Sequence, residues 1–418
     1  MAVAPLSICM FSNLFRPVVS GSATQSEALA RELARLGHRP FVITARVRED
    51  SAEYEESAGV PIYRLPALRL PSMGIALNFP WLSYTFTPGN LRRIDDILRK
   101  HRPDVLHLHN HMFDLAFAAV RMKRRWKIPL LVTIHTMIRH VKPFYNLILY
   151  PADRVFLRFA VIKRCDTVIC PDYNIKTYAD DAWPGSNARV CPYGVAVPPA
   201  ADPKQVDELH RKHNLAGKRV ILSLGHVHEL RHRRELISIL PEIRRVIPNI
   251  VVLIVGAETI SSPRKLAQTL QVSDAVVFAG HAPHELIPAY LALADVEMHL
   301  FYQDAIERTS LGIASMEAMG ASKVVLVAAN QDTYGPGTLR NGENVIFVDP
   351  AKPQEITRTL VELLGDKDRR DRIGAAARRF VEEHLSWAGI AAQTVDLYRA
   401  ALQDSRLGSP PTELTEGA

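Results

Sequence analysis

The chain of 418 residues lacks an uninterrupted apolar run of about 18 residues, the length that a membrane-spanning helix needs. Its first residues, MAVAPLSICMFSNLF, contain no basic segment followed by a long apolar stretch, so a signal peptide is not expected. The four cysteines, Cys9, Cys165, Cys170 and Cys191, form no CxxC pair. Reduced thiols and a cytoplasmic location are therefore predicted.

The sequence also lacks zinc-finger spacing and an aromatic-rich RNA-binding signature, so no nucleic-acid partner is expected. Its formal net charge is +7, which favours an anionic partner such as a nucleotide, a phosphate or an acidic membrane surface. The positive charge is densest in RMKRRWK (121–127) and ELRHRRE (229–235). For each run, the solvated face of a helix is as good an interpretation as a surface that binds an anionic partner.

Short apolar runs alternate with helical patterns along most of the chain, which is typical of parallel α/β sheets. In the first half, strands are expected at 6–12, 40–45, 104–109, 129–135 and 166–171, with helices at 23–38 and 91–103. In the second half, strands are expected at 219–225, 250–256, 275–280, 295–301, 323–329 and 344–349.

The proline-rich and alanine-rich segment YGVAVPPAADPKQ separates the two series and is interpreted as a linker. The sequence thus predicts two Rossmann-like domains, 1–198 and 199–385, followed by a helix at 386–403 and a disordered tail at 404–418. Two such domains joined by a hinge enclose a cleft. Ligands of parallel sheets bind beyond the carboxyl ends of the strands, so candidate sites are expected in the loops that follow strands.

The first such loop contains Ser20, Gly21 and Ser22, ahead of a helix expected to begin near Ala23 or Thr24. Free N–H groups and the helix dipole at a helix start favour an anion. The loop is neither a P-loop nor a dinucleotide fingerprint. An ordinary turn with a serine or threonine N-cap is the other interpretation.

Histidines follow two neighbouring strands. His107, His109 and His111 alternate in DVLHLHNH and share one face if the strand continues, and His135 ends the next strand. An HxH pair after a strand can ligate zinc, but the acids that would complete such a site are scattered. Hydrogen-bonded core histidines are a further interpretation. Histidine at two strand ends favours a site in the cleft.

In the second half, Gly225 ends a strand and allows a ligand to approach the backbone closely. His226 and Arg231 follow, and cations at this point would neutralise a diphosphate, which an arginine can bind in a bidentate manner. Alternatively, Arg231, Arg233 and Arg234 face water.

The last candidate segment is DAIERTSLGIASMEAMG, where Thr309 or Ser310 is expected to cap a helix that begins near Leu311. Ser310, Leu311 and Gly312 would then present free N–H groups to a phosphate. Glu317 lies about two turns into this helix among small and apolar neighbours. It is either a surface acid or a buried one that needs partners, such as two hydroxyls of a ribose.

The chain contains, in order, FSNLFRPVVSGSATQSEALARELARLGHRPFVIT, RPDVLHLHNH, IPLLVTIHTM, VCPYGVAV, LSLGHVHELR, VFAGHAPHELIPAYLALADVEMHLF, TSLGIASMEAMGASKVVLVA and HLSWAGIAAQTVDLYRAAL. The order and spacing of these segments resemble the retaining glycosyltransferases of family 4, which have the GT-B fold. The resemblance covers nearly the whole chain. The N-terminal block and the HTM tripeptide look most like members that glucosylate diacylglycerol or other lipids.

The resemblance implies a nucleotide-sugar donor in the C-terminal domain, an acceptor on the N-terminal domain, and a final helix that crosses back to the N-terminal domain. By matched position, His109 is the active-site histidine beside the transferred sugar, and the turn at Gly21 approaches the donor phosphates. Glu317 matches the second acid of the family's E-x7-E motif, which the resemblance implies would bind the donor ribose. His135 is a candidate substrate-binding residue. No metal and no cofactor other than the donor co-substrate are expected, because basic side chains and a helix N-terminus stabilise the departing diphosphate.

The sequence departs from the family pattern at two places. The first acid of E-x7-E falls on Thr309, and the nearest carboxylate, Glu307, is two residues too early. The arginine and lysine that usually follow the first strand of the C-terminal domain are His226 and Arg231 here. A neutral histidine is a weaker phosphate partner, although a diphosphate's field could charge it.

We therefore expect a hexosyltransferase that moves a hexose from a UDP- or GDP-linked sugar to an acceptor hydroxyl with retention. Arg231 and residues 310–312 would hold the diphosphate, and Glu307 is a candidate substitute for the acid missing at Thr309. A catalytically weak or inactive GT-B partner subunit is the alternative, and a metal hydrolase is a third.

The acceptor is expected to be a lipid, a saccharide or a small molecule. The apolar segment at 65–91 would either touch a lipid at the inner face of a membrane or pack against its own domain.

Overall fold

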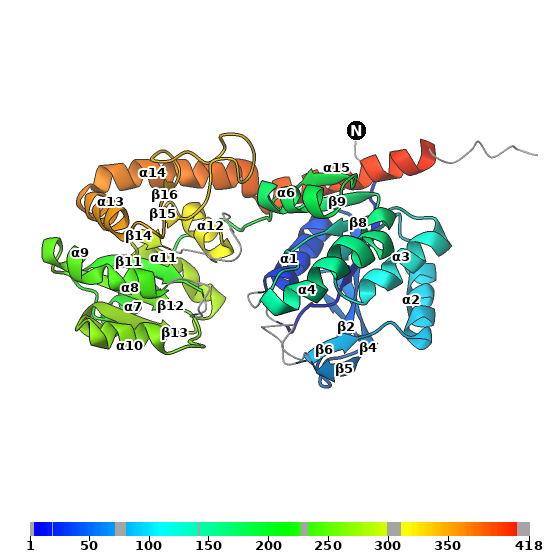
Figure 1. Ribbon diagram of the computed structural model, residues 1–418, viewed down its shortest axis with the longest axis horizontal. Coiled ribbons are helices and arrows are strands. Elements are labelled where there is room, and N and C mark those ends of the chain that lie inside the picture. Colours follow the sequence, from blue (N-terminus) through cyan, green and yellow to red (C-terminus); the bar gives the residue numbers. More distant parts are fainter. Residues whose placement is uncertain are drawn as a thin grey trace, which may run out of the picture. The chain divides into compact units, whose positions relative to one another are not determined.

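The structure is a computed structural model that describes residues 4–18, 20–71, 81–140, 143–225, 227, 233–298 and 311–407. Its contacts divide the chain into two compact units (Figure 1). The first unit comprises residues 1–194 and 387–418, and the second comprises residues 195–386. The division after Gly194 lies close to the domain boundary expected at 198.

The first unit contains an eight-stranded sheet in the order β10-β9-β8-β7-β1-β2-β4-β3, within the described residues. All neighbouring strands are parallel except β3 and β4. The strands are β1 (Ser7–Ser12), β2 (Arg39–Arg46), β3 (Tyr54–Ser57), β4 (Val60–Pro66), β7 (Val105–His109), β8 (Leu130–Thr133), β9 (Thr167–Cys170) and β10 (Ala188–Val190). The five strands expected in the first half are thus confirmed as β1, β2, β7, β8 and β9, of which β2 is longer than expected and the others are shorter. Strands β3, β4 and β10 were not expected.

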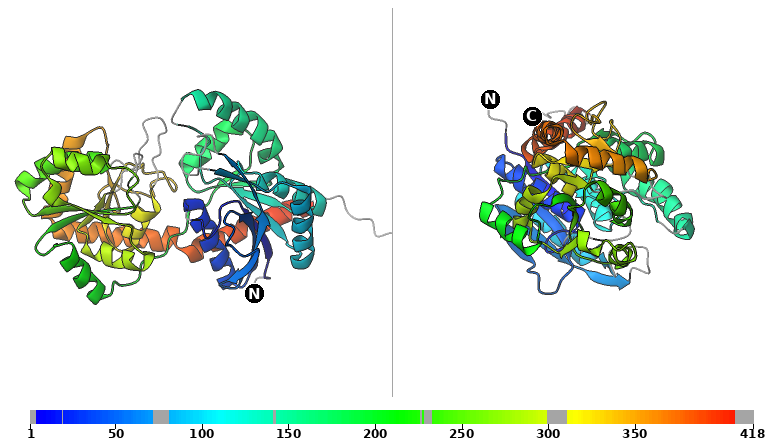
Figure 2. Two further views of the ribbon diagram at one scale, coloured as in Figure 1. Left: turned by 90° about the horizontal axis from the view of Figure 1, so that it is seen from below. Right: turned by 90° about the vertical axis from the view of Figure 1, so that its left-hand side faces the viewer.

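Helices cover both faces of this sheet (Figure 2). They are α1 (Gly21–Arg35), α2 (Pro88–His101), α3 (Leu115–Trp126), α4 (Pro143–Pro151), α5 (Arg158–Ala160), α6 (Tyr173–Ala182) and α15 (Trp387–Leu407), with a π-helical turn η1 (Ala152–Leu157) and a 3-10 turn η2 (Ile162–Arg164). Because side chains alternate along a strand, Ile8 and Met10 share a buried cluster with α1 and α15, whereas Cys9 and Phe11 share one with α2 and α3.

The final helix α15 belongs to the first unit, which confirms the expected return of the chain to the N-terminal domain. It packs through Ile390, Val395 and Tyr398 on the α1 face of the sheet. The expected disordered tail is wrong in its first four residues, because α15 continues to Leu407. Three of these four residues are polar but compatible with a helix, and the Ser405 hydroxyl donates to the Leu402 carbonyl, 2.9 Å away. Residues 408–418 lie outside the described part.

The segment at 65–91 contains two short strands in the part that is described. Strands β5 (Leu68–Pro71) and β6 (Trp81–Tyr84) pair as an antiparallel ribbon, and residues 72–80 lie outside the described part. Leu68 and Leu70 are exposed. None of the helices in the described residues is long and apolar enough to cross a bilayer.

The second unit contains a six-stranded parallel sheet in the order β13-β12-β11-β14-β15-β16, again within the described residues. Its strands are β11 (Arg219–Leu224), β12 (Ile250–Val255), β13 (Val276–Gly280), β14 (Val296–Met298), β15 (Val324–Val327) and β16 (Ile346–Phe347). Its helices are α7 (Pro203–Lys212), α8 (Arg233–Ser238), α9 (Leu240–Val246), α10 (Ser262–Thr269), α11 (Ile287–Leu293), α12 (Ile313–Gly320), α13 (Pro353–Gly365) and α14 (Lys367–Phe380), with short turns η4 (Ser273–Ala275), η5 (His284–Leu286) and η6 (Val381–Leu385).

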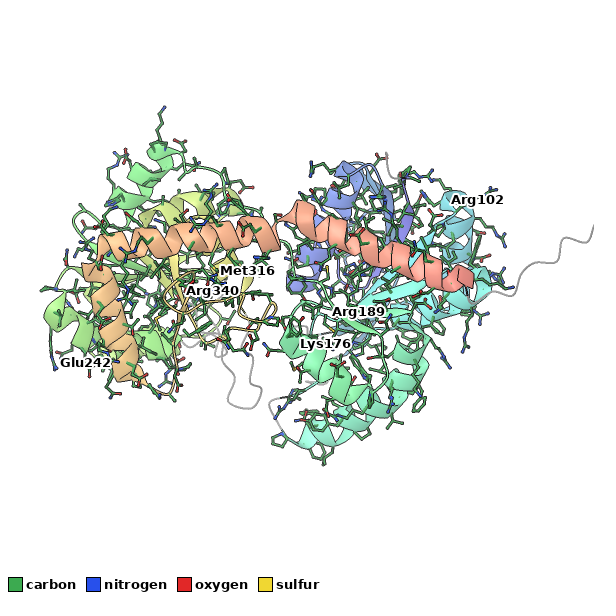
Figure 3. The ribbon with its side chains drawn as sticks, turned by 90° about the horizontal axis from the view of Figure 1, so that it is seen from above. Arg102, Lys176, Arg189, Glu242, Met316 and Arg340 are labelled. Carbon is green, nitrogen blue, oxygen red and sulfur yellow. The ribbon has the colours of Figure 1, made fainter. Side chains whose placement is uncertain are left out.

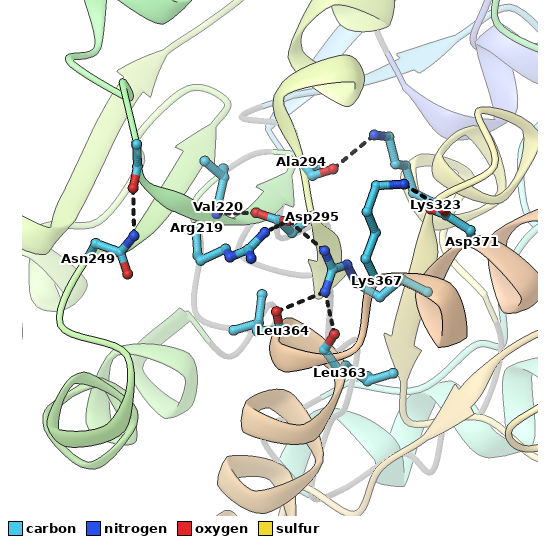
Figure 4. Close-up of polar contacts among 12 residues, drawn as sticks. Arg219, Val220, Asn249, Ala294, Asp295, Lys323, Leu363, Leu364, Lys367 and Asp371 are labelled. Atoms are coloured by element: carbon cyan, nitrogen blue, oxygen red, sulfur yellow. Dashed lines mark hydrogen bonds and ion pairs between the residues drawn. The ribbon is translucent and has the colours of Figure 1, made fainter.

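A polar network fixes the amino-terminal edge of this second sheet (Figure 4). The Asp295 carboxylate accepts from the Val220 amide at 2.8 Å and pairs with Arg219 at 3.2 Å and Arg370 at 3.1 Å. Arg370 is nearly buried and also donates to the Leu364 carbonyl at the end of α13. The charges at this edge therefore satisfy one another, and the candidate ligand loops lie at the opposite edge.

Candidate functional site

Two histidines occupy one face of β7 at the centre of the first sheet. The rings of His107 and His109 lie 4.3 Å apart between centroids, on the face covered by α1 and α15. His107 is fully buried, and its two ring nitrogens lie 2.7 Å from the hydroxyls of Tyr398 and Thr133. His107 is thus the hydrogen-bonded core histidine that the sequence offered as an alternative.

His109 lies further along β7 and begins a chain of hydrogen bonds. Its Nδ1 is 3.0 Å from Nε2 of His135, and Nδ1 of His135 is 2.8 Å from the hydroxyl of Tyr193. The amide of His135 donates to the side chain of Asn110, which fixes the position of the second imidazole. The Nε2 of His109 is buried and has no hydrogen-bond partner among the described residues. The structure therefore brings together the two predicted histidines, His109 and His135.

This cluster is electrically neutral. Burial lowers the pKa of His107 and of His135 to about 3. Burial, followed by the neighbouring histidines, also lowers the pKa of His109 well below its usual value. Neutral imidazoles act as hydrogen-bond donors and acceptors, so the cluster is suited to bind hydroxyl groups and unsuited to compensate a phosphate charge.

The direction of the hydrogen bonds determines what Nε2 of His109 offers. If Tyr193 donates to His135, then His135 donates to Nδ1 of His109, and Nε2 of His109 carries the proton. The reverse order makes Nε2 an acceptor. The three residues, together with Trp387 of α15, border a hollow of about 30 Å³ in the first unit. A hollow of that size has room for a water molecule or a hydroxyl beside the rings.

The expectation that His111 shares the face of His107 and His109 is wrong. The strand ends at His109, and Asn110 takes a positive φ of 72°, which turns the chain away from the strand direction. His111 is buried elsewhere, with Nε2 3.2 Å from the Asp153 carboxylate. Within the described residues, no group of three or more histidine, cysteine or acidic side chains is arranged to hold a metal ion.

The first predicted anion loop lies at the start of α1. The helix begins at Gly21, two residues earlier than expected, because Ser20 is its N-cap and accepts from the Ala23 amide at 3.2 Å. The hydroxyls of Ser20 and Ser22 lie 3.3 Å apart. An added Cβ at Gly21 would meet no atom within 4 Å, so the space beside the first residue of α1 is open where a side chain would point.

Gly225 follows β11 with a φ of +102°, a conformation that favours glycine. The interpretation that Arg233 faces water is wrong. Its guanidinium is buried and donates to the carbonyls of Leu224, at 2.8 Å, and Gly225, at 3.2 Å, and so fixes this turn. The predicted site residues His226 and Arg231 lie outside the described residues.

The helix with the predicted ribose-binding acid, α12, begins at Ile313 with Gly312 as its N-cap. The expected start near Leu311 is wrong by two residues, because Gly312 keeps an extended conformation with ψ of 154°. The free amides of the first turn therefore begin at Gly312, and Leu311 lies before the helix and is buried. The predicted residues Glu307, Thr309 and Ser310 lie outside the described residues.

Glu317 lies on α12, which contributes Met316, Ala318 and Met319 to the buried part of the second unit, and Figure 3 labels Met316 on this helix. The side chain of Glu317 is only 17% exposed, so it is not the ordinary surface acid of the alternative interpretation. Burial raises the pKa of the Glu317 carboxyl, and His284, 3.9 Å away, offsets part of this rise. Within the described part of the chain, this loose contact is the one polar partner of the carboxylate.

Sequence reasoning missed three residues that organise these sites, Asn110, Tyr193 and Tyr398, and misassigned a fourth, Arg233. Tyr193 stands in the quoted segment VCPYGVAV, but nothing nearby in the sequence connects it to His135. Asn110 is the one with a local signal, because asparagine directly after a strand is among the residues that tolerate a positive φ.

Comparisons with known proteins agree with this architecture. Residues 19–197 match the family described as Glycosyltransferase Family 4, and residues 205–380 match the family described as Glycosyl transferases group 1. The two matches follow the two sheets of the structure and together span most of the chain.

Among curated proteins, the chain is similar to a GDP-mannose-dependent alpha-(1-6)-phosphatidylinositol monomannoside mannosyltransferase of Mycobacterium tuberculosis. The two are 29% identical over 231 residues, which are 54% of this chain and 60% of that protein. The matched region thus spans somewhat less than two thirds of that relative. An alpha-monoglucosyldiacylglycerol synthase of Streptococcus pneumoniae is 22% identical over 78% of this chain and 71% of its own length.

Among solved structures, HepE of Anabaena in complex with UDP-glucose has a TM-score of 0.69. It is 15% identical, and the likeness covers 94% of this chain and all of that one. At this identity, the likeness establishes the fold. The two family matches, the two parallel sheets and the returning helix α15 lead to one conclusion: the chain belongs to the family 4 glycosyltransferases with the GT-B fold.

Proposed function

We propose that the protein transfers a hexose from a nucleoside-diphosphate sugar to an acceptor hydroxyl with retention of configuration, forming an α-glycosidic bond. The donor is UDP- or GDP-linked, and the acceptor is a lipid or another component of the cell envelope. No metal and no other cofactor takes part. The expected cytoplasmic location, peripheral at the inner face of a membrane, belongs to the same proposal.

The observation that carries the proposal is the largely buried carboxylate of Glu317 on α12, which has no hydrogen-bond partner among the described residues. A buried acid needs hydrogen-bond donors, and its contact with His284 is too long to be a hydrogen bond. The two vicinal hydroxyls of a ribose are donors at the spacing of two carboxylate oxygens. Glu317 would therefore hold the ribose, and the amides that begin at Gly312 would face the diphosphate.

In the first unit, the neutral His109 would bind a hydroxyl of the transferred sugar through Nε2, with His135 and Tyr193 fixing the orientation of its ring. The start of α1 at Gly21 would approach the donor phosphates. The acceptor oxygen would bond to the anomeric carbon on the face from which the diphosphate leaves. The bond from that carbon to the phosphate oxygen would break, and the acceptor proton would pass to the diphosphate.

The lipid acceptor is supported by the names of two relatives, a phosphatidylinositol monomannoside mannosyltransferase and an alpha-monoglucosyldiacylglycerol synthase. The UDP-linked donor is supported by the HepE complex with UDP-glucose, and the GDP-linked donor by the mannosyltransferase. Arg231 and Ser310 stay candidates for holding the diphosphate, and Glu307 stays a candidate for contacting the sugar.

The test incubates purified protein with UDP-glucose or GDP-mannose and with diacylglycerol or phosphatidylinositol acceptors. Mass spectrometry detects the glycosylated lipid, and proton NMR of its anomeric signal reports the configuration. An α-linked product supports the proposal. Absence of nucleotide binding in calorimetry, together with no donor consumption, would overturn it.

A catalytically weak GT-B partner subunit is the second candidate, and the observation that favours it is Thr309 in place of the first acid of E-x7-E. This alternative predicts nucleotide binding without turnover. Under it, the Thr309→Glu variant should gain transfer activity that the natural chain lacks.

A further inference from the structure

The first unit exposes a continuous apolar helix face. The helix formed by α4, η1 and α5 projects from the edge of this unit, as the blue-green helix at the lower edge of Figure 3 shows. Six of its large apolar side chains are between 52% and 72% exposed: Phe144, Leu147, Ile148, Val155, Phe156 and Phe159. None of the residues of α4 is buried. So many exposed aromatic and aliphatic side chains on one helix mark a surface that meets an apolar partner.

The fold holds this helix in a defined orientation. Asp153 of η1 is buried, and its carboxylate accepts from the hydroxyl of Tyr178 at 2.5 Å and contacts His111 at 3.2 Å. Leu157 is also buried against the core, and the indole of Trp183 donates to the Asp153 carbonyl. One side of η1 is thus anchored by hydrogen bonds and packing. The exposed apolar side therefore results from the fold itself.

The charge around the exposed side chains is positive. From residue 143 to residue 164 the sequence has one acid, the buried Asp153, and four basic residues: Arg154, Arg158, Lys163 and Arg164. The Lys163 ammonium lies 4.5 Å from the ring centroid of Phe159, so the positive charge stands directly beside the apolar face. Arg154 also pairs with the exposed Asp181, a contact that water weakens.

A basic hollow of about 470 Å³ continues this surface toward α3. Arg121, Arg124 and Arg164 border it together with apolar side chains that include Phe117. The ring of Phe117 lies 5.8 Å from that of Phe156, so the hollow and the exposed helix face adjoin. The basic run at 121–127, for which the sequence offered attraction to anionic lipid headgroups or a solvated helix face, therefore borders the same surface.

We propose that this surface, formed by α4, η1, α5 and the arginines of α3, docks on an anionic lipid bilayer. Exposed aromatic and aliphatic residues flanked by cations match the interface of such a bilayer, where the apolar side chains enter the boundary between headgroups and acyl chains. Each basic residue near an anionic surface strengthens binding about fivefold, the equivalent of about 1 kcal/mol. The proposal rests on the membrane location of the proposed function and names the surface that would meet the bilayer. Docking requires neither a donor nor turnover, so it can be tested apart from the transferase activity.

The test is co-sedimentation of the full chain with vesicles of phosphatidylcholine alone or of phosphatidylcholine mixed with phosphatidylglycerol. We expect binding to the mixed vesicles that falls as salt is raised. The Ile148→Glu variant should bind at least about tenfold more weakly, because it removes an apolar side chain that would enter the bilayer and adds a negative charge that the anionic lipids repel. Val246→Glu is the matched control, because Val246 is exposed to 63% on α9 and Ile148 to 66% on α4.

Charge reversal gives a second, independent comparison. The double variant Arg121→Glu and Arg124→Glu should weaken binding to anionic vesicles at least about 25-fold, which is the product of two fivefold losses. The double variant Arg358→Glu and Arg372→Glu changes the net charge equally on exposed helix positions of the second unit and should bind as the natural chain does.

Three outcomes would overturn the proposal. The first is that the natural chain stays in the supernatant with anionic vesicles. The second is an equal loss of binding in the test and control variants. The third is a concentration-dependent dimer that Ile148→Glu dissociates without any vesicle binding, which would assign the surface to a second copy of the chain. Nucleotide affinity, measured in parallel, should be unchanged in all four variants, so a failure of docking is distinguishable from a failure of the transferase proposal.

Discussion

Replacing Glu317 by glutamine should weaken nucleotide binding and at the same time stabilise the free protein. The substitution keeps the size of the side chain and removes its charge. In the free protein, the carboxylate is largely buried and its one described polar contact, with His284, is 3.9 Å long. An ionised group in that environment is costly until hydroxyl donors reach it.

The binding loss can be estimated from the hydrogen bonds involved. A hydrogen bond to an ionised acceptor contributes about 1.5–3 kcal/mol, and a neutral one contributes about 0.5–1.5 kcal/mol. The glutamine retains one oxygen acceptor, so two charged hydrogen bonds are replaced by one neutral bond. A loss of at least about 1.5 kcal/mol follows, which raises the dissociation constant of UDP or GDP about 12-fold or more.

The stability gain follows from the direction of the pKa shift. Burial raises the pKa of the Glu317 carboxyl in the folded state, so the folded protein favours the protonated form more than the unfolded chain does. The contribution of this group to stability is complete below the ordinary carboxyl pKa and decreases as pH rises through the raised value. At neutral pH the natural chain therefore bears a cost that the glutamine variant avoids.

Two measurements check both halves of this prediction. Isothermal titration calorimetry at neutral pH gives the dissociation constant, and urea unfolding without ligand gives the free energy of unfolding. Glu242→Gln is the control, because Glu242 is exposed and Figure 3 shows it on the opposite side of the second unit from Met316. An unchanged dissociation constant in Glu317→Gln would refute the assignment of Glu317 to the ribose, whatever happens to stability.

Three further predictions address the remaining parts of the sites. Gly21→Ala should raise the KM for the donor several-fold without lowering the urea midpoint, because the added methyl meets no protein atom and would meet only an approaching phosphate. Burial lowers the pKa of His107 to about 3, so between about pH 6.5 and pH 3 only the unfolded chain takes up a proton at this residue. The free energy of unfolding of the natural chain therefore falls with pH in that range, and in His107→Gln it should fall less steeply, by up to about 1.4 kcal/mol per pH unit. Urea unfolding at several pH values measures this slope. Gly374→Ala should destabilise by about 1–3 kcal/mol or more in urea unfolding, because its Cβ would lie 2.0 Å from the Ser322 carbonyl oxygen, whereas Gly365→Ala, which meets no atom, should not.

The strands could be predicted from the sequence because their signal is local. Runs such as IVVLIV are apolar on both faces, as strands of a parallel sheet covered by helices on both sides must be. The helix starts were harder to place, because N-capping is decided by the conformation of a single residue. Ser20 and Gly312 both stand at cap positions, and each moved its helix start by two residues from the expected place.

The partners of the site residues could not be predicted, because the chain brings them together from distant positions. Tyr193 reaches His135 across 58 residues, and Tyr398 reaches His107 across 291 residues. A sequence pattern reports which residues lie on one face of one strand, but not which side chain of another element faces them. For the same reason, Arg233 was grouped with its charged neighbours, although its guanidinium is buried against the turn at Gly225.

The two units differ in the chemistry that they contribute to the proposed reaction. In the first unit, burial holds the pKa values of His109 and His135 far below neutrality, so His109 is unsuited to donate a proton as a general acid, which needs a pKa near the working pH. In the proposed reaction, the role of His109 would therefore be to orient a hydroxyl, and the acceptor proton would leave by another route. The departing diphosphate would be the base that takes it. A Tyr193→Phe variant should therefore lower kcat by disturbing the orientation of His135 and His109 while leaving the dependence of kcat on pH unchanged, because no histidine in this cluster titrates near neutral pH.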